Sequence, residues 1–196
     1  MYTSASPRPW DASRVSDHLQ IQQLMYKFCS AVDKLDLEAL RSVYHPDAYD
    51  NHGPFKGQVD SFIEWVQKRH SRGITFSSHM IGNMLIEFSS DTHALVESYV
   101  RTVQQYDEHA AASLNELFPG QSVAPAEGAI LFSSSRYVDR VERRDSGWKI
   151  LSRQVVAGWK GVAPAQAGVA APGWEYGTRD RNDFFLRELR ALGLNE

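Results

Sequence analysis

The segment SVYHPDAYDNHGPFKG, residues 42–57, concentrates polar side chains that could do chemistry. His45, Asp47, Asp50 and His52 are residue types that bind divalent cations. Their spacing argues against a metal site, because metal-binding histidines commonly come from neighbouring strands or from positions i and i+4 of a helix. His45 instead precedes a helix-stopping proline, and Asp47 lies in the turn after it. We expect no bound metal, and we interpret His45 and Asp47 as a structural helix stop.

The second half of this segment has the alternation of a short strand. Asp50 and His52 fall on one face of that strand, and Asn51 falls on the other. One side of this edge is therefore expected to line a cavity and to orient a polar group of a ligand. We predict Asp50, Asn51 and His52 as substrate-binding residues.

A carboxylate and a phenol lie together on the first predicted helix, residues 17–33. The apolar stripe of this helix centres near Val32, and Tyr26 and Asp33 both fall at its edge. Both side chains could therefore face a cavity, and Tyr26 is predicted to bind substrate. The alternative for Asp33 is an ordinary solvated position at the surface.

A histidine lies in the apolar strand pattern SSHMIGN, where alternation places His79, Ile81 and Asn83 on one face. A lone histidine in such a strand is often structural. An imidazole has an ordinary pKa near 6.5, however, and a carboxylate partner would fix its tautomer. Such a pair is suited to removing a proton from carbon near neutral pH.

Arg136 follows the serine run of a later strand, and either face of that strand could line the cavity. Arg136 would bind an oxyanion or phenolate if it faced inward. Its alternative is an ion pair with Glu97 or Asp139. Tyr99 and Tyr106, on the neighbouring strand, would form the cavity wall against a flat aromatic ligand. The alternative is that both belong to the ordinary hydrophobic core.

Three helices are predicted first, followed by a sheet. Asp17 and Gln20 resemble a capping box for the first helix. Asp36 is expected to cap a second helix, which Pro46 stops, and a third helix is expected to end at Gly73. β-branched and aromatic residues then predict four antiparallel strands, over residues 74–88, 93–106, 129–144 and 147–159.

The connections complete the predicted domain organisation. Residues 1–16 form an N-terminal arm, 17–160 the domain, and 161–196 a flexible segment with a short final helix capped by Asn182 or Asp183. The stretch 107–128 is too long for a simple turn, so we interpret it as a flap over the site.

Composition excludes several classes of protein. A chain of 196 residues suits a single domain, and its net charge of −3 provides no basic surface for nucleic acid. No signal-peptide pattern and no apolar run of about 18 residues occurs, so we expect no membrane association and a cytoplasmic location. The single cysteine, Cys29, excludes a disulfide within the chain.

Five segments together resemble the SnoaL-like branch of the nuclear-transport-factor-2-like superfamily, which includes scytalone dehydratase, bile-acid 7α-dehydratase and hexachlorocyclohexane dehydrochlorinase. They are FCSAVDKLD, SVYHPDAYDNHGPFKG, SSHMIGN, ESYV and RYVDRVERRDSGWKI. The resemblance implies an α+β fold, a cone-shaped α+β barrel in which a curved antiparallel sheet wraps a long N-terminal helix. Val32 replaces the tyrosine that precedes the aspartate in scytalone dehydratase, and the second histidine of that enzyme is unmatched.

The resemblance also implies roles for Asp33 and His79. In the dehydratase and dehydrochlorinase members the matching aspartate orients a histidine base, so His79 and Asp33 are the expected catalytic residues and no cofactor is required. The implied function is a lyase for a hydrophobic aromatic or polycyclic alcohol that releases water, or formaldehyde by C–C cleavage. An isomerase or cyclase, and a non-catalytic binding module, remain alternatives. We also expect a homotrimer, or otherwise a dimer, because both faces of the sheet carry large apolar residues.

Overall fold

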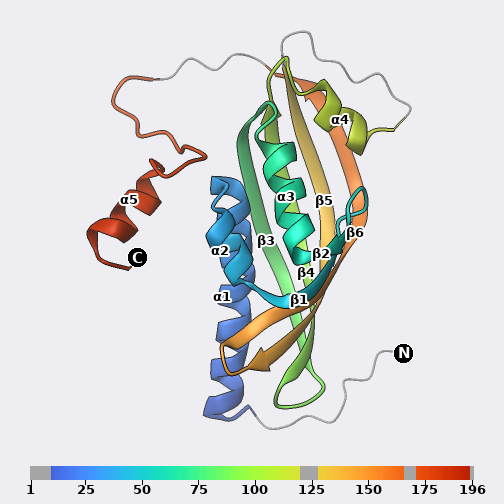
Figure 1. Cartoon of the computed structure of the whole chain (residues 1–196), viewed down its shortest axis with the longest axis vertical. Helices are drawn as coiled ribbons and strands as arrows, with labels where there is room; N and C mark the ends of the chain where they lie inside the picture. The colour runs from blue at the N-terminus through green and yellow to red at the C-terminus, as the bar shows by residue number, and fades with distance from the viewer. Residues whose placement is uncertain (1–9, 120–127, 166–170, 195–196) are drawn as a thin grey trace.

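The computed structural model describes residues 10–119, 128–165 and 171–194, in which three helices precede most of the sheet (Figure 1). The helices are α1 (Ala12–Lys34), α2 (Leu37–Ser42), α3 (Val59–His70), α4 (Ala111–Leu117) and α5 (Phe184–Ala191). The strands are β1 (Tyr44–Asn51), β2 (Lys56–Gln58), β3 (Ile74–Phe88), β4 (His93–Tyr106), β5 (Ala129–Arg144) and β6 (Gly147–Pro164). Among the described residues, no helix is both long enough and apolar enough to span a bilayer.

One sheet carries all six strands, in the order β2-β1-β6-β5-β4-β3. The four long strands form the predicted antiparallel meander, and β1 joins it by pairing in parallel with β6. The sheet curves around α1 and α3 but is not a closed barrel, because β2 and β3 are its two edges. The prediction of an α+β fold, in which a curved sheet wraps a long N-terminal helix, is confirmed, and the curved sheet is open.

Two irregularities bend this sheet beside its concave face. In β6, Ala157 pairs with Ser135 and Trp159 with Ser134, so Gly158 is an extra residue. A Cβ at Gly158 would lie 2.6 Å from the carbonyl oxygen of Ser134, so only glycine fits there. The pairing of β3 with β4 also shifts, between residues 81 and 84.

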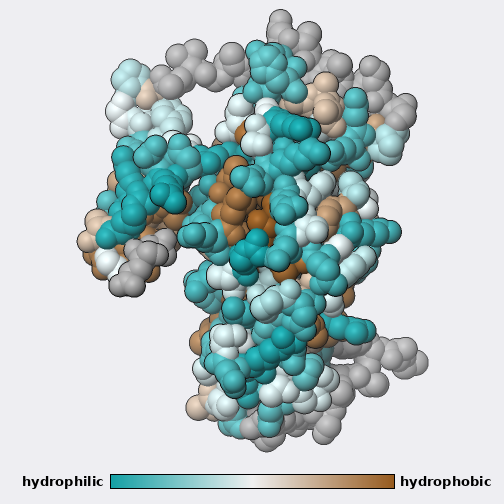
Figure 2. Space-filling view, in the orientation of Figure 1, coloured by the Kyte–Doolittle hydropathy of each residue, from teal (hydrophilic) through white to brown (hydrophobic). Residues whose placement is uncertain are grey.

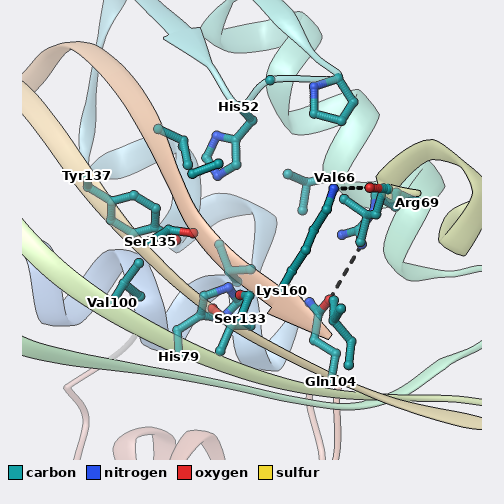
Figure 3. A pocket seen from close by; sticks show the side chains of 18 of the residues that line it. His52, Val66, Arg69, His79, Val100, Gln104, Ser133, Ser135, Tyr137 and Lys160 are labelled. Carbon is teal, nitrogen blue, oxygen red and sulfur yellow. Dashed lines mark hydrogen bonds between the residues drawn. The ribbon is translucent and has the colours of Figure 1, made fainter. Parts of the chain in front are cut away.

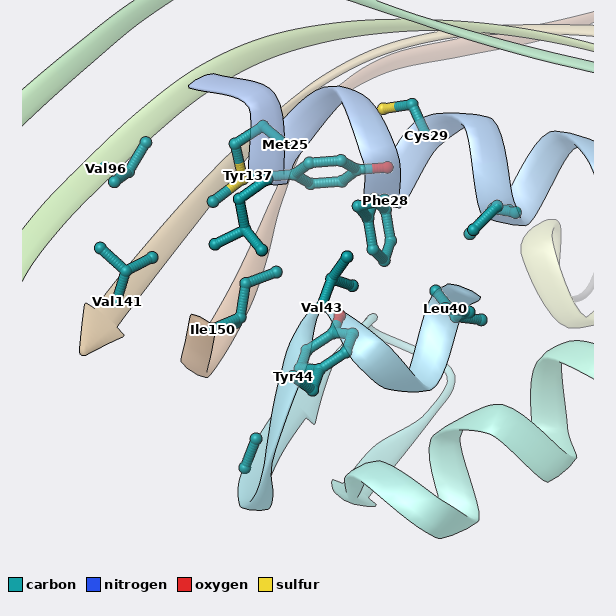
Figure 4. Close-up of a cluster of buried hydrophobic side chains, with 14 of the residues drawn as sticks. Met25, Phe28, Cys29, Leu40, Val43, Tyr44, Val96, Tyr137, Val141 and Ile150 are labelled. Carbon is teal, nitrogen blue, oxygen red and sulfur yellow. The ribbon is translucent and has the colours of Figure 1, made fainter. Parts of the chain in front are cut away.

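The main hydrophobic core lies between α1 and the sheet (Figure 4). Met25, Phe28 and Val32 repeat at helical spacing along α1, and they pack against Tyr137 of β5 and Ile150 of β6. A second cluster joins α4 to the far ends of β4 and β5. The start of the predicted flap is therefore a packed helix, while residues 120–127 of the flap lie outside the described residues.

The helix ends correct two predictions made from sequence. Asp11 caps α1, which begins five residues before the predicted capping box. Asp17 is instead buried, where it accepts hydrogen bonds from Arg143 and Trp148 at 2.8 and 2.9 Å. Pro46 lies within β1 rather than ending a helix.

The predicted caps Asp36 of α2 and Asp183 of α5 are confirmed, since each accepts a hydrogen bond from its helix backbone. The C-terminal helix α5 lies against the end of α1, where Lys34 approaches the ring of Phe185. Figure 2 shows hydrophobic residues grouped around α2, α3 and α5 on a face that is otherwise largely polar.

Candidate active site

A cavity of about 340 Å³ opens on the concave side of the sheet (Figure 3). Its walls come from α1, α3, α4 and the strands β3 to β6, together with the segment that follows β1. Aromatic and aliphatic side chains form most of the surface, and a few polar groups converge on the space, as in binding sites for small molecules.

The predicted pair of Asp33 and His79 meets at this cavity. His79 Nδ1 lies 2.6 Å from Asp33 Oδ1, and the backbone N–H of His79 donates to Asp33 Oδ2 at 2.7 Å. Ser77 Oγ donates to the same carboxylate at 2.8 Å. With Nδ1–H donated to Asp33, a neutral His79 carries its lone pair on Nε2, and its ring lines the cavity.

Two features hold Asp33 in place at the C-terminal end of α1. Leu35 ends the helix in the left-handed conformation, with φ of 55°. Arg179, from the segment before α5, donates to the carbonyl oxygens of Asp33 and Val32 at 2.9 and 3.3 Å. A helix C-terminus disfavours a carboxylate, so the donors on Asp33 are needed to keep it charged.

The electrostatic balance of Asp33 favours the carboxylate form. Burial alone would raise its pKa, but the hydrogen bonds from His79 and Ser77 and the charge on His79 outweigh burial and lower the pKa. Asp33 is therefore an anion near neutral pH, ready to stabilise an imidazolium on His79.

A second histidine–aspartate pair lies across the cavity. His52 Nδ1 is 2.5 Å from Asp50 Oδ1, and Tyr44 Oη donates to Asp50 Oδ2 at 2.6 Å. The ring of His52 stacks on Phe62 with centroids 4.9 Å apart. Burial would raise the pKa of Asp50, but the charge and hydrogen bond of His52 lower it overall. Figure 3 shows His52 and His79 on opposite walls.

The four candidate metal ligands of residues 42–57 do not come together. His45 is buried, and its Nε2 bonds the carbonyl oxygen of Glu142 at 2.9 Å. Asp47 lies at the surface, paired with Arg144. Asp50 and His52 form their own pair, and the described residues contain no group of three or more metal-ligating side chains.

Two of the three residues predicted on this edge do not contact the cavity. His52 lines it, but Asp50 is fully buried and contacts His52 rather than the cavity. Asn51 points away, as the alternation requires, and donates to Gln154 at 2.7 Å. The direct substrate contacts predicted for Asp50 and Asn51 are therefore wrong.

The structure also corrects Tyr26, Tyr99 and Arg136. Tyr26 is 48% exposed on the outer side of α1, because the buried stripe of that helix runs through Met25 and Phe28. Tyr99 and Arg136 are paired on the convex face of the sheet. Arg136 forms an ion pair with Glu97 there, which was the alternative to an oxyanion site.

Sequence reasoning left open which face of β5 lines the cavity, and it missed the cavity residues on α3. Ser133, Ser135 and Tyr137 are on the inward face of β5, opposite to Arg136. Arg69 and His70 come from the last turn of α3. Arg69 could have been found, since it follows the buried Phe62 and Val66 at helical spacing.

The prediction that Asn83 shares a face with His79 is wrong, because Asn83 is exposed. The irregularity between residues 81 and 84 interrupts the alternation, so the inward positions continue at Met84 and Ile86. Tyr106 is buried in the second core cluster, where its hydroxyl accepts a hydrogen bond from Arg69 at 2.6 Å.

Comparisons with known proteins agree with this fold. The chain is 26% identical over 144 residues to the uncharacterized protein Rv2910c of Mycobacterium tuberculosis, covering 72% of this chain and 85% of that protein. Among solved structures, the hexachlorocyclohexane dehydrochlorinase LinA-type3 of Novosphingobium barchaimii superposes with a TM-score of 0.64 at 17% identity, covering 81% of this chain and 98% of that chain.

A candidate scytalone dehydratase from Novosphingobium aromaticivorans superposes with a TM-score of 0.60 at 19% identity, covering 84% of this chain and 97% of that chain. At these identities the structural likenesses show the fold. The profile of the SnoaL-like domain matches residues 13–154, which is most of the chain. The protein belongs to the SnoaL-like family.

Proposed function

We propose that the protein is a cofactor-independent lyase that acts on a hydrophobic aromatic or polycyclic alcohol by base-promoted elimination. The observation that carries the proposal is the 2.6 Å contact between His79 Nδ1 and Asp33 Oδ1 at the wall of a largely apolar cavity. A carboxylate that fixes the tautomer and stabilises the imidazolium makes His79 a competent base for a C–H proton.

The pair formed by His52 and Asp50 supplies the acid that such a reaction needs. His79 Nε2 takes a proton from carbon, the C–H electron pair forms the double bond, and the C–O bond breaks. The hydroxyl leaves with its bonding pair and takes a proton from the His52 imidazolium, giving water. Exchange with solvent then removes the proton from His79 and returns one to His52.

Release of formaldehyde would use the same two groups. His79 would take the proton of a hydroxymethyl O–H, and the C–C bond would break to give formaldehyde. The released electron pair would form the double bond and expel a neighbouring hydroxyl, which His52 protonates to water. The substrate would then be a diol, such as an aryl-propanediol.

The test is turnover of a panel of aryl-propanediols, hydroxysteroids and hydroxylated naphthalenes, followed by product mass. His79→Gln should lower kcat by about 10²- to 10⁴-fold, which is the usual contribution of a general base. His93→Gln, at the exposed start of β4, is the matched control and should leave kcat unchanged. An unchanged kcat in His79→Gln would show that His79 is not the base. A product with the same mass as its substrate would indicate an isomerase.

Self-association through the convex face of the sheet is part of this proposal. Large apolar residues there are at least 40% exposed, namely Phe76, Met80, Leu85, Leu95, Tyr99 and Phe132. The described part of the C-terminal segment leaves them uncovered, because α5 docks at α1 instead. An apolar face of this kind is seldom left in water, so we propose a homotrimer. Light scattering should give about three times the chain mass of 22.1 kDa, and the monomer mass would refute association.

A further inference from the structure

Arg69 places a buried positive charge at the wall of the cavity. Its side chain reaches inward from the last turn of α3, and the residue is only 8% exposed. Nη2 donates to Tyr106 Oη at 2.6 Å and lies 3.5 Å from Gln104 Oε1, while Nη1 faces His70 Nε2 at 3.3 Å. Within the described ranges no carboxylate pairs with Arg69, and its Nε has no hydrogen-bond partner.

The neighbours of Arg69 do not neutralise it. His70 stays neutral, because burial and then the charges of Arg69 and Arg179 hold its pKa well below the ordinary value. Burial raises the pKa of Tyr106, so the phenol also stays protonated. Arg179 adds a second cation, which contacts His70 Nδ1 at 2.7 Å.

This end of the cavity therefore has an excess of positive charge. A third cation, Lys160, lines the same cavity, where it donates to the carbonyl oxygen of Leu117. Figure 3 shows Arg69, Gln104 and Lys160 together on one side of the space, with His52 and Tyr137 on the other. A buried charge without a counter-ion costs several kcal/mol, so an anion that enters the cavity would be bound strongly.

A structural role alone explains this arrangement less well. Arg69 does tie α3 to β4 through Tyr106 and Gln104, but neutral side chains could make those contacts without burying a charge. The position of Arg69 also suits a role in the reaction. Gln104 Nε2 donates to Ser77 Oγ at 3.3 Å, and Ser77 bonds Asp33, so hydrogen bonds connect Arg69 to the pair formed by Asp33 and His79.

We propose that the substrate carries a carboxylate, and that Arg69 binds this group at the end of the cavity away from His52. This inference rests on the proposed lyase function and specifies its substrate class as an aromatic hydroxy acid. The guanidinium suits a planar carboxylate, with which it makes paired hydrogen bonds. An anchored carboxylate would present the hydrophobic body of the substrate to His79 and its hydroxyl to His52.

The test compares two probes of the same shape, 2-naphthoate and 2-naphthamide, by isothermal titration calorimetry at constant ionic strength. The wild-type protein should bind the carboxylate at least about 10-fold more tightly than the amide, as expected for hydrogen bonds to a charged group. Arg69→Gln should lose this preference. Arg136→Gln removes the same charge from the convex face and should keep the preference.

A wild-type protein that does not prefer the carboxylate, or that binds neither probe, would overturn the inference, as would a preference that survives in Arg69→Gln. Arg69→Lys keeps the charge without the guanidinium, and it should retain a reduced preference, which serves as the readout if Arg69→Gln does not fold. Binding needs no turnover, so His79→Gln should keep the preference. A preference with no turnover of any panel compound or of any aromatic hydroxy acid would refute the lyase and leave the anion site intact.

Discussion

Arg153 and Arg69 are both buried on the concave side of the sheet, but their surroundings differ. Arg153 lies in the closed core, where Nε and Nη2 donate to Asp139 at 2.7 and 2.8 Å. Its guanidinium packs over Phe28, 3.8 Å from the ring centroid, and 4.2 Å from that of Tyr137. Arg69 lies beside open space, and its described polar partners are neutral.

The difference separates a structural charge from a charge available to a ligand. In the closed core no ligand can enter, so the chain supplies its own counter-ion in Asp139. At the cavity the chain leaves the charge of Arg69 uncompensated, at a cost in stability that a bound anion would recover. Sites for ligands are places where a fold tolerates such a cost.

The largest effect expected from this comparison is on stability. Asp139→Asn leaves Arg153 charged, fully buried and without its counter-ion, so it should lower the free energy of unfolding by about 3–5 kcal/mol. Arg69→Gln removes a charge that has no counter-ion, so it should cost about 1 kcal/mol or less, or stabilise the protein. Urea unfolding of both variants measures this, and equal losses would show that Arg69 is as structural as Arg153.

A smaller effect is expected on the pH dependence of stability. His70 has a depressed pKa in the folded protein, so between that value and about 6.5 the unfolded chain binds a proton that the folded protein does not. The free energy of unfolding must therefore fall as the pH drops from 7 toward 5. His70 contributes up to about 1.4 kcal/mol per pH unit to this fall.

His70→Gln isolates this contribution, because the other titrating groups remain in both proteins. The difference in unfolding free energy between wild type and variant should shrink steadily from pH 7 to pH 5. The charge of Arg69 helps to depress the pKa of His70, so Arg69→Gln should weaken the slope. A pH-independent difference would mean that burial and the neighbouring charges do not depress the pKa of His70 in the folded protein.

Much of the fold could be predicted from sequence because its signals are local. Alternating β-branched and aromatic residues between turn residues gave the bounds of β3, β4 and β5 as the structure has them. The contact between Asp33 and His79 was also predicted, because the family resemblance supplied a pairing of residues from α1 and β3 that spacing alone does not reveal. Their 2.6 Å separation argues against a merely non-catalytic module.

The errors concern which way a side chain faces. Alternation divides β5 into two faces but does not say which is concave, so Arg136 and Ser135 could not be ranked. An irregularity in β3 moved Asn83 outward. Helical spacing could have placed Arg69 on the buried face of α3, but it could not show the significance of Arg69 or Arg179. That significance depends on which charges lie nearby, and the surrounding residues come from distant parts of the chain.

The smallest effect expected is that of metal removal, which we predict to be zero. Of the four candidate ligands in residues 42–57, His45 and Asp47 are held by Glu142 and Arg144. Asp50 and His52 alone make a pair, which is fewer ligands than a closed metal site requires. Exhaustive dialysis against EDTA should therefore leave the melting temperature and the turnover unchanged. A loss of activity that zinc or manganese restores would mean that His52 and Asp50 bind a metal rather than form the acid of the proposed reaction.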